Sequence, residues 1–288
     1  MPLTLLAKAK VNLALHVTGQ REDGYHLLDT LVAFPDIGDQ ILVSPSDRLM
    51  LTLDGPFAEE LSASGGGEEN IALQAAKLLC GERSGPSRNC SIKLTKNLPV
   101  ASGIGGGSAD AAATLKALNA YWQLRLSDTE LIEYATRLGA DVPMCVYQCP
   151  LRAQGIGDDI STQSPFPPCG IILINPRIPV STPDVFKKLI HKNSPPLPEI
   201  PRRWKSLDHL VEWLCQTRND LEASARLIAP QITDAIGWLD AQDGCRFARM
   251  SGSGATCFAL FENEEQAKNI ARTMRFERPD CWVGAGAI

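Results

Sequence analysis

Residues 103–107 are the part of the chain whose composition is most suited to chemistry, because four of these five residues are glycine. They precede an alanine-rich run from Ser108 to Asn119 that contains no glycine or proline and therefore favours a helix. Glycine lets a ligand come close to the main chain and accepts left-handed backbone angles. Exposed amides at the positive end of a helix attract phosphate. The segment therefore predicts a phosphate-binding loop.

Two common glycine motifs do not describe this loop. The P-loop requires a lysine followed by serine or threonine, which is absent here, and the dinucleotide fingerprint needs a glycine where Ser108 stands. A flexible glycine linker remains as an alternative, although a position between a strand and a helix argues against it. Ser108 also adds a hydroxyl at the helix start, which makes it the one candidate protein ligand for a metal ion.

A lysine and an asparagine are expected to lie side by side near the N-terminus. From Ala7 to Val17 alternate residues are apolar, which is the period of a strand. Lys10 and Asn12 then share its other face, roughly 7 Å apart. On this face the two side chains could hold one ligand.

The elements around these residues indicate a mixed α+β fold. The first part of the chain is rich in strands, with runs at Leu27 to Phe34, Asp39 to Val43 and Leu49 to Leu53 that are spaced as antiparallel neighbours. A helix from Glu68 to Cys80 and a short strand from Ser91 to Thr95 follow.

Further elements alternate through the rest of the chain. Ser127 and Glu130 form a capping box for a helix that reaches Leu138, and Gly139 stops it. The remaining expectations are a buried strand at Gly170 to Ile174, a helix start at Thr182, a proline-rich linker at 193–201, helices at 207–215, 220–227 and 232–241, and a glycine turn at 251–254 before a strand through Phe258.

The overall composition is that of a globular enzyme. Hydrophobic residues make up 44% of the 288 residues and charged residues 21%, which excludes a disordered chain. The net charge of -5 argues against nucleic-acid partners. The nine cysteines lack the spacing of a disulfide framework or a zinc site. With no export signal and no apolar run long enough to cross a membrane, we expect a cytoplasmic enzyme with small-molecule partners.

The segment Pro99 to Asp110 resembles the signature of the GHMP kinases, a family named for galactokinase, homoserine kinase, mevalonate kinase and phosphomevalonate kinase. Four further segments carry the same resemblance, namely Ala7–Leu13, Gly24–His26, Leu138–Pro143 and Met250–Thr256. It implies a two-domain architecture with an active-site cleft between the domains. We assign residues 1–150, joined by a last strand at about 280–288, to an ATP-binding domain and residues 151–279 to a substrate domain.

The resemblance also implies the reaction. It is strongest to the branch that uses ATP and Mg²⁺ to phosphorylate the 2-hydroxyl of cytidine diphosphate methylerythritol, on the non-mevalonate route to isoprenoid precursors. The implied ATP-binding residues are Asn70, Lys96, Pro99, Val100, Ala101, Ser102, Gly103, Ile104, Gly105, Gly106, Gly107, Ser108 and Ala109. Outside the loop, Asn70 could instead be a helix cap and Lys96 a surface charge.

Two residues match the catalytic positions of the family. Asp141 matches the base that takes the proton of the attacking hydroxyl, and Lys10 matches the lysine whose charge keeps that carboxylate ionised. Each has a simpler alternative: Asp141 precedes Pro143 and could be a helix N-cap, and a strand lysine is usually a surface charge.

The resemblance assigns the acceptor site to residues distant in sequence. The implied residues are Asn12, Tyr25, His26, Thr182 and Phe186, with Phe186 opposite Tyr25 across the cytosine base. The turn from Ser251 to Thr256 is expected to support the glycine loop.

Two loop residues depart from the family pattern. Ala101 stands where relatives often have glycine, and Ala109 replaces a serine, which removes one hydroxyl near Mg²⁺.

Other functions stay open at this stage. The acceptor could be a homoserine or a mevalonate type of alcohol, although Tyr25 and His26 favour one that carries a nucleotide. A catalytically inactive, nucleotide-binding regulator is the alternative from another class, but such a protein would not need both Lys10 and Asp141. We expect a monomer or a weak homodimer.

Overall fold

The computed structural model describes residues 1–64, 67, 69–81 and 88–288, and these fold into two compact units. Unit 1 contains Met1–Ala9, Gly38–Val100 and Gly105–Gln148, and unit 2 contains Lys10–Ile37, Ala101–Ile104 and Cys149–Ile288. Both units combine helices with sheets, so the α+β prediction is confirmed.

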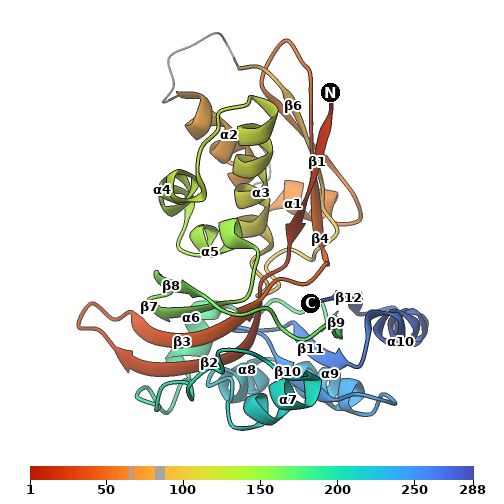
Figure 1. Cartoon of the computed structure of the whole chain (residues 1–288). Coiled ribbons are helices and arrows are strands. Elements are labelled where there is room, and N and C mark those ends of the chain that lie inside the picture. The colour runs from red at the N-terminus through yellow and green to blue at the C-terminus, as the bar shows by residue number, and fades with distance from the viewer. Residues whose placement is uncertain (65–66, 68, 82–87) are drawn as a thin grey trace. The chain divides into compact units, whose positions relative to one another are not determined.

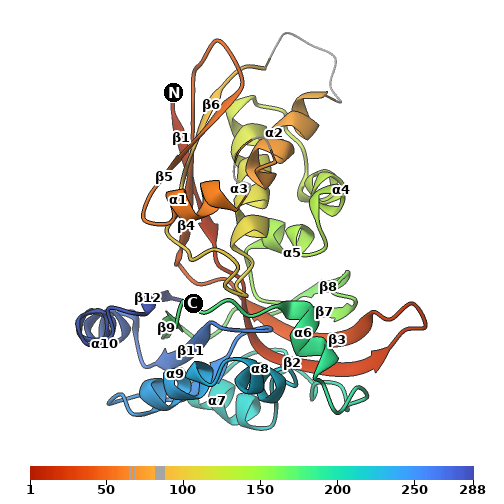
Figure 2. The same ribbon diagram turned by 180° about the vertical axis from the view of Figure 1, so that it is seen from behind.

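Unit 1 is a four-stranded sheet with helices on one face (Figures 1 and 2). The strand order is β1-β4-β6-β5, in which β5 is parallel to β6 and the other pairs are antiparallel. The strands are β1 Leu3–Lys8, β4 Gly38–Ser44, β5 Met50–Asp54 and β6 Ser91–Thr95. The helices are α1 Ala58–Ala63, α2 Ile71–Gly81, α3 Gly106–Tyr121, α4 Asp128–Leu138 and α5 Val142–Tyr147.

Helix α3 is the centre of unit 1, because it contacts β1, β4, α2 and α5. Its alanines at 111–113 are fully buried, and such small side chains let the helix lie close to its neighbours. At 16 residues α3 is the longest described helix, and none of the described helices is both long and apolar enough to cross a membrane. Helix α4 begins with the predicted capping box, in which Ser127 and Glu130 satisfy each other's backbone amides.

Unit 2 contains two four-stranded antiparallel sheets. One has the order β2-β3-β7-β8 and the other β10-β11-β9-β12. The strands are β2 Val11–Gln20, β3 His26–Ala33, β7 Leu151–Gly155, β8 Asp159–Thr162, β9 Gly170–Asn175, β10 Phe247–Met250, β11 Cys257–Phe261 and β12 Trp282–Ala287. The helices are α6 Thr182–Lys187, α7 Leu207–Cys215, α8 Glu222–Ile228, α9 Gln231–Asp240 and α10 Glu264–Glu277.

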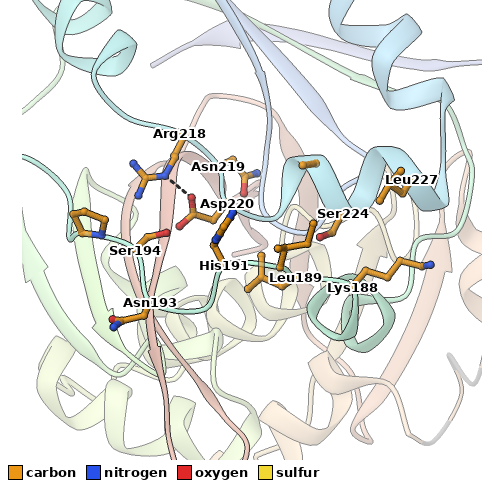
Figure 3. Close-up of a pocket in the computed structure, with 13 residues that line it drawn as sticks. Lys188, Leu189, His191, Asn193, Ser194, Arg218, Asn219, Asp220, Ser224 and Leu227 are labelled. Carbon is orange, nitrogen blue, oxygen red and sulfur yellow. Dashed lines mark hydrogen bonds and ion pairs between the residues drawn. The ribbon is translucent and has the colours of Figure 1, made fainter.

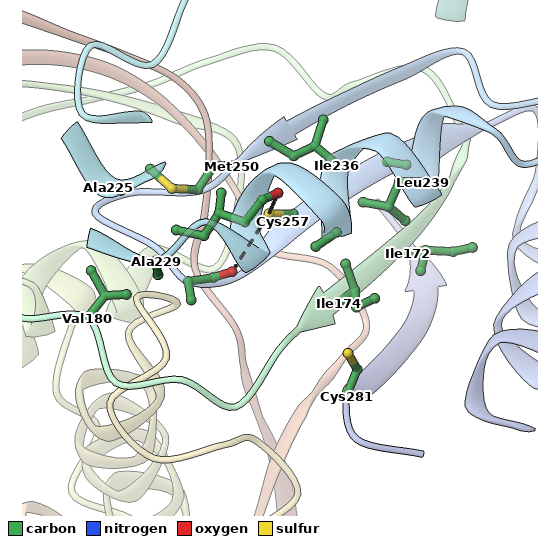
Figure 4. Close-up of a cluster of buried hydrophobic side chains, with 14 of the residues drawn as sticks. Ile172, Ile174, Val180, Ala225, Ala229, Ile236, Leu239, Met250, Cys257 and Cys281 are labelled. Atoms are coloured by element: carbon green, nitrogen blue, oxygen red, sulfur yellow. Dashed lines mark hydrogen bonds between the residues drawn. The ribbon is translucent and has the colours of Figure 1, made fainter. Parts of the chain in front are cut away.

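The core of unit 2 is formed by the second sheet and helices α8, α9 and α10 (Figure 4). Every residue of β9 is buried, as the sequence predicts for this strand. Ile172 and Ile174 of β9 belong to one cluster with Cys257 of β11 and Met250 of β10. All nine cysteines are within the described residues, and none forms a disulfide.

Some strand predictions were wrong about the sheet to which a strand belongs or about the direction of its pairing. The run Ala7 to Val17 is two strands in different sheets, because the chain leaves β1 at Ala9 and Lys10 before β2 begins. Both faces of β2 are buried, including Asn12 and His16 on the face predicted to be polar. The run near residue 50 is a parallel neighbour of β6, not an antiparallel one. The predicted helix start at Glu68 lies outside the described residues.

The compact units differ from the contiguous division at residue 150. Residues Lys10–Ile37 belong to unit 2, because β2 and β3 form a sheet with β7 and β8. The C-terminal strand β12 pairs with β9 and so also belongs to unit 2, whereas the sequence assigned it to the first domain. These pairings join residues more than 100 positions apart, which local periodicity does not encode.

The proline-rich segment 193–201 has no regular secondary structure, but it is not a loose linker. Its Ser194 amide donates to Val17 O (2.8 Å), and its Leu197 amide donates to Asp29 Oδ2 (2.9 Å). His16 Nδ1 donates to Pro195 O (2.9 Å), while its Nε2 accepts from the Arg218 amide (3.2 Å). Neutral His16 therefore fastens the segment to β2.

Unit 2 should lose stability in weak acid because of His16. Burial lowers the pKa of His16 below its ordinary 6.5, so the unfolded chain binds the proton more readily. This contribution is complete above pH 6.5 and is lost as the pH falls through 6.5 toward the lower folded pKa. We expect the thermal midpoint to fall between pH 7 and pH 5.

A substitution separates this effect from general acid sensitivity. The thermal midpoint of His16→Gln should fall less steeply over the same range, whereas the exposed His191→Gln should match the wild type. The pKa of His26 is lowered too, so part of the slope persists. An unchanged slope in His16→Gln, measured by circular dichroism, would contradict the assignment.

Candidate active site

The second half of the glycine loop becomes the first turn of α3. The helix begins at Gly106, two residues before the predicted start, and its N-cap Gly105 adopts a left-handed conformation with φ 65°. Gly105 has no side chain with which to cap the helix, and Gly107 is exposed. The first amides of α3 therefore form the type of helix end that binds phosphate.

A buried ion cluster lies beneath this helix start. Lys96 Nζ donates to Asp39 Oδ2 and, at 2.9 Å, to Asp110 Oδ2. All three side chains are almost completely buried. A Cβ atom on Gly106 would lie 3.1 Å from Lys96 Nζ, so glycine lets the helix start lie close to the cluster.

The cluster has unusual protonation equilibria. Burial acts to lower the pKa of Lys96, but the carboxylates of Asp110 and Asp39 offset this effect and raise it overall. Burial also raises the pKa of Asp110 well above its ordinary value, despite the nearby ammonium. Lys96 therefore stays charged near neutral pH.

The position of Lys96 excludes the alternative that it is a surface charge. Its amide donates to Asp54 O (2.7 Å) and its carbonyl accepts from the Phe57 amide (3.2 Å), in addition to the ion pairs of its side chain. Its predicted contact with adenosine stays a prediction.

Asn70 has the alternative role that the sequence left open. Its Oδ1 accepts from the Ala72 amide (2.9 Å) at the start of α2, so this residue is a helix cap. Its predicted role in adenosine binding stays a prediction.

The first half of the glycine loop belongs to unit 2, where the turn Ser251–Thr256 holds it. A Cβ atom on Gly103 would lie 3.0 Å from the carbonyl carbon of Gly254 and closer still to its oxygen. Thr256 Oγ1 donates to Ser102 O (2.6 Å) and accepts from Asn175 Nδ2 (2.9 Å). The expectation that this turn supports the loop is therefore confirmed.

Ala101 adopts the backbone conformation that favours glycine. Its φ is 50°, which costs roughly 1 kcal/mol for a residue with a Cβ. This gives a physical reason for a glycine at this position.

Lys10 and Asn12 lie beside this half of the loop. The Lys10 amide donates to Ile104 O (2.8 Å), and the Asn12 amide donates to Ser251 Oγ (3.0 Å). Both side chains are buried, so Lys10 is not a surface charge. Asn12 Nδ2 donates to Thr30 Oγ1 (2.8 Å), while its buried Oδ1 has no hydrogen-bond partner among the described residues. Such an oxygen can accept a hydrogen bond from a ligand.

Asp141 lies in unit 1 at the N-cap position of α5, with Pro143 in the first turn. Its side chain makes no capping hydrogen bond within the described part of the chain. Asp141 therefore has the position of an N-cap without its side-chain hydrogen bond, and its side chain is half-buried.

Four of the five predicted acceptor residues, all except Asn12, line one pocket of about 560 Å³ in unit 2, a size typical of small-molecule sites. It is lined by Tyr25, His26, Thr182 and Phe186, among others. Phe186 stacks on His26, with ring centroids 4.7 Å apart, whereas the sequence placed it opposite Tyr25. Tyr25 is 64% exposed, and its predicted position opposite Phe186 across a base stays a prediction.

His26 and Thr182 have further polar features in this pocket. Burial lowers the pKa of His26, with a contribution from Lys192, so its imidazole is neutral at pH 7. Its Nε2 is buried with no partner among the described residues. Thr182 Oγ1 shares a hydrogen bond with Ser253 Oγ (2.7 Å), which connects the pocket to the turn that holds the glycine loop.

A second pocket of about 540 Å³ opens elsewhere in unit 2 (Figure 3). Arg218 and Asp220 form an ion pair (2.5 Å) on one side, and Leu189 and Leu227 lie on the other. Its described lining contains none of the residues that the sequence predicted for the active site.

Comparisons with known proteins agree with this geometry. Residues 70–149 match the model of the GHMP kinases N terminal domain, and residues 187–280 match that of the GHMP kinases C terminal. A relative from Ruegeria pomeroyi, named 4-diphosphocytidyl-2-C-methyl-D-erythritol kinase, is 51% identical over 292 residues, covering 100% of both chains. This chain belongs to the GHMP kinase family.

Solved structures extend the comparison. A crystal structure of 4-(cytidine 5'-diphospho)-2C-methyl-D-erythritol kinase is 32% identical, with a TM-score of 0.78 over 99% of this GHMP kinase and 98% of that chain. A crystal structure of mevalonate kinase has a TM-score of 0.68 over 99% of each chain, but at 13% identity it supports the fold alone.

The residues of this GHMP kinase fit ATP better than they fit a metal ion held by protein alone. The helix start at Gly106 offers main-chain amides to phosphate, and the exposed Gly107 has no side chain that would keep a phosphate away from them. In the described ranges no group of three or more His, Cys, Asp or Glu side chains could hold a metal ion. Mg²⁺ is commonly bound through substrate phosphates and water with few protein ligands.

Sequence reasoning missed Asp39, Asp110 and Asn175 in this GHMP kinase. Of these three residues, Asp110 alone had a sequence signal. It is an acidic residue three positions after Gly107, within an alanine-rich run that favours a helix. Asp39 and Asn175 lie at strand ends and reach the site only through long-range folding.

Proposed function

We propose that this GHMP kinase transfers the γ-phosphoryl group of ATP to the 2-hydroxyl of 4-diphosphocytidyl-2-C-methyl-D-erythritol, which gives the 2-phosphate and ADP. The observation that carries the proposal is the 51% identity, over the full length of both chains, to a relative that bears the name of this kinase. The pocket at Tyr25 and Phe186 adds an aromatic surface suited to a pyrimidine base.

The ATP phosphates bind to the amides at the start of α3, and Mg²⁺ bound with them would neutralise part of their charge. Ser108, at the start of α3, would offer Mg²⁺ a hydroxyl. The loop from Pro99 to Ala109 supplies most of its contacts through main-chain groups, since its side chains are short or apolar.

Asp141 takes the proton of the attacking 2-hydroxyl, whose oxygen forms the new bond to the γ-phosphorus as the bond to ADP breaks. Lys10 supplies a fixed positive charge that keeps Asp141 ionised and stabilises the transferring phosphoryl group. Asn12 accepts a hydrogen bond from the acceptor through its buried Oδ1. Because phosphoryl transfer depends mainly on position and charge, these few groups suffice.

The cytidine end of the acceptor binds in the pocket of unit 2. The rings of Tyr25 and Phe186 pack against the base, and Thr182 lies beside it. Neutral His26 can donate or accept at Nε2, which matches the mixed donor and acceptor edge of cytosine. Homoserine and mevalonate have no aromatic base for such a pocket, which makes them weaker candidates.

An acceptor panel tests this function. ADP release from ATP is measured with the cytidine diphosphate acceptor, homoserine and mevalonate in turn. We expect turnover with the first alone. Phe186→Ala should raise the KM for this acceptor about tenfold and leave the KM for ATP unchanged, because stacking on a base contributes roughly 1–3 kcal/mol. Turnover with homoserine or mevalonate only would overturn the proposed acceptor, and no ATP-dependent turnover would favour the inactive regulator.

A further inference from the structure

The buried cluster of Asp39, Lys96 and Asp110 connects three separate elements of unit 1. Asp39 is on β4, Lys96 follows β6, and Asp110 is in the first turns of α3. Lys96 Nζ is the common partner of both carboxylates. Since the side chains are buried, the ammonium fixes the distance of α3 from the sheet.

The cluster also reaches the start of the glycine loop. Asp39 Oδ1 accepts from the Asn97 amide (2.6 Å) and from the Leu98 amide (2.8 Å). These residues lead directly into the loop at Pro99. At the other end of the loop, the position of a Cβ atom on Gly106 is 3.1 Å from Lys96 Nζ and 3.8 Å from Asp39 Oδ2. The chain therefore meets the same cluster where the loop begins and where α3 begins.

Stability alone is a weak reason for such a cluster. Buried ion pairs are costly to desolvate, and well-packed apolar residues commonly serve stability equally well. What a buried charge cluster adds is a defined geometry, because a hydrogen-bonded ammonium accepts only one arrangement of its partners.

We propose that Asp39, Lys96 and Asp110 are positioning residues for nucleotide binding, which hold the first amides of α3 where the ATP phosphates bind. Lys96 thus acts through the main chain beneath Gly106. This inference rests on the proposed ATP-dependent function and adds to it three residues that control the affinity of the loop for phosphate.

The charge of the cluster is compatible with a triphosphate nearby. Two ionised carboxylates and one ammonium would leave a net negative charge, which would repel phosphate. Burial raises the pKa of Asp110 well above its ordinary value, which favours the neutral form of this carboxyl and so reduces the negative charge of the cluster. Asp110 Oδ1 has no hydrogen-bond partner in the described residues.

A double substitution separates position from stability. Lys96→Met removes the ammonium that links α3 to the sheet but leaves two buried carboxylates. The thermal midpoint of this variant should therefore fall. Adding Asp110→Asn removes one of those carboxylates, and Asp39 keeps its two backbone donors. The double variant should therefore recover much of its thermal midpoint. Because the ammonium that links α3 to the sheet is still absent, we expect the ADP affinity of the double variant, measured by calorimetry, to stay at least about tenfold weaker than that of the wild type.

Steady-state kinetics provide the second readout. The KM for ATP of the double variant should rise about tenfold or more, while the KM for the acceptor stays within about twofold. The matched control is Lys93→Met on β6, which removes an exposed ion pair with Asp54 of β5 (2.6 Å). It should bind ADP as the wild type does.

The outcomes distinguish this inference from the proposed function. A stable double variant with wild-type ADP affinity would overturn the positioning role and leave the kinase assignment intact. A double variant that fails to fold would assign the cluster to stability and also overturn it. If the wild type binds ADP but phosphorylates no acceptor, the proposed function fails, and the comparison of ADP affinities still decides the role of the cluster.

Discussion

Asp141→Asn should lower kcat by about 10²- to 10⁴-fold, the usual contribution of a general base. Asparagine keeps the size of the side chain but cannot accept the proton of the attacking hydroxyl. The substitution should leave α5 in place, because asparagine is as favourable as aspartate at the N-cap position that Asp141 occupies. We therefore expect the KM for ATP to change little. The measurement is a steady-state assay of ADP release with both substrates varied.

A true helix cap provides the control for this prediction. Ser127→Ala removes the capping box of the neighbouring helix α4, which should cost about 1 kcal/mol of stability. It should leave kcat unchanged, since Ser127 is exposed. If instead Asp141→Asn behaved like Ser127→Ala, with reduced stability and normal kcat, Asp141 would be structural and the base would have to be sought elsewhere.

Gly103→Ala should be among the most damaging single substitutions in unit 2. At φ 75° an alanine is strained by roughly 1–2 kcal/mol. Its Cβ would also meet the backbone of Gly254, which cannot move as a flexible side chain could. We expect the free energy of unfolding to fall by at least about 2 kcal/mol, and the KM for ATP to rise with the displacement of the loop. Chemical denaturation and kinetics measure the two effects.

Gly107→Ala is the matched control in the same loop. A Cβ atom there would meet only Ile71 Cγ2, at an ordinary 3.7 Å. Alanine also favours the helix in which Gly107 lies. Its stability should equal or slightly exceed that of the wild type. Equal stability of the Gly103 and Gly107 variants would show that the contact between the loop and the turn at Gly254 is not tight.

Local sequence signals predicted the elements that are marked by capping residues, by alternating apolar residues or by glycine. The capping box at Ser127 placed the start of α4, and the strand at Ser91–Thr95 has the bounds that its alternating pattern indicates. The glycine loop was recognised because glycine and alanine have distinct backbone preferences. These features depend on residues close in sequence, which is why they could be read directly.

Long-range features could not be predicted in the same way. Alternation continues through Ala9 and Lys10, so it does not reveal that the chain passes there from one sheet to another. A lysine at 96 looks like a surface charge until folding brings Asp39 and Asp110 to it. The stacking of Phe186 on His26 likewise depends on residues 160 positions apart.

The most direct test of the proposed kinase is the identity of its product. The wild-type chain is incubated with ATP, Mg²⁺ and 4-diphosphocytidyl-2-C-methyl-D-erythritol, and the mixture is followed by phosphorus and carbon NMR. We expect ADP together with a new phosphomonoester whose carbon coupling places it on the 2-hydroxyl. An acceptor that remains unchanged while the folded chain binds ADP, or a phosphate on another hydroxyl, would contradict the account.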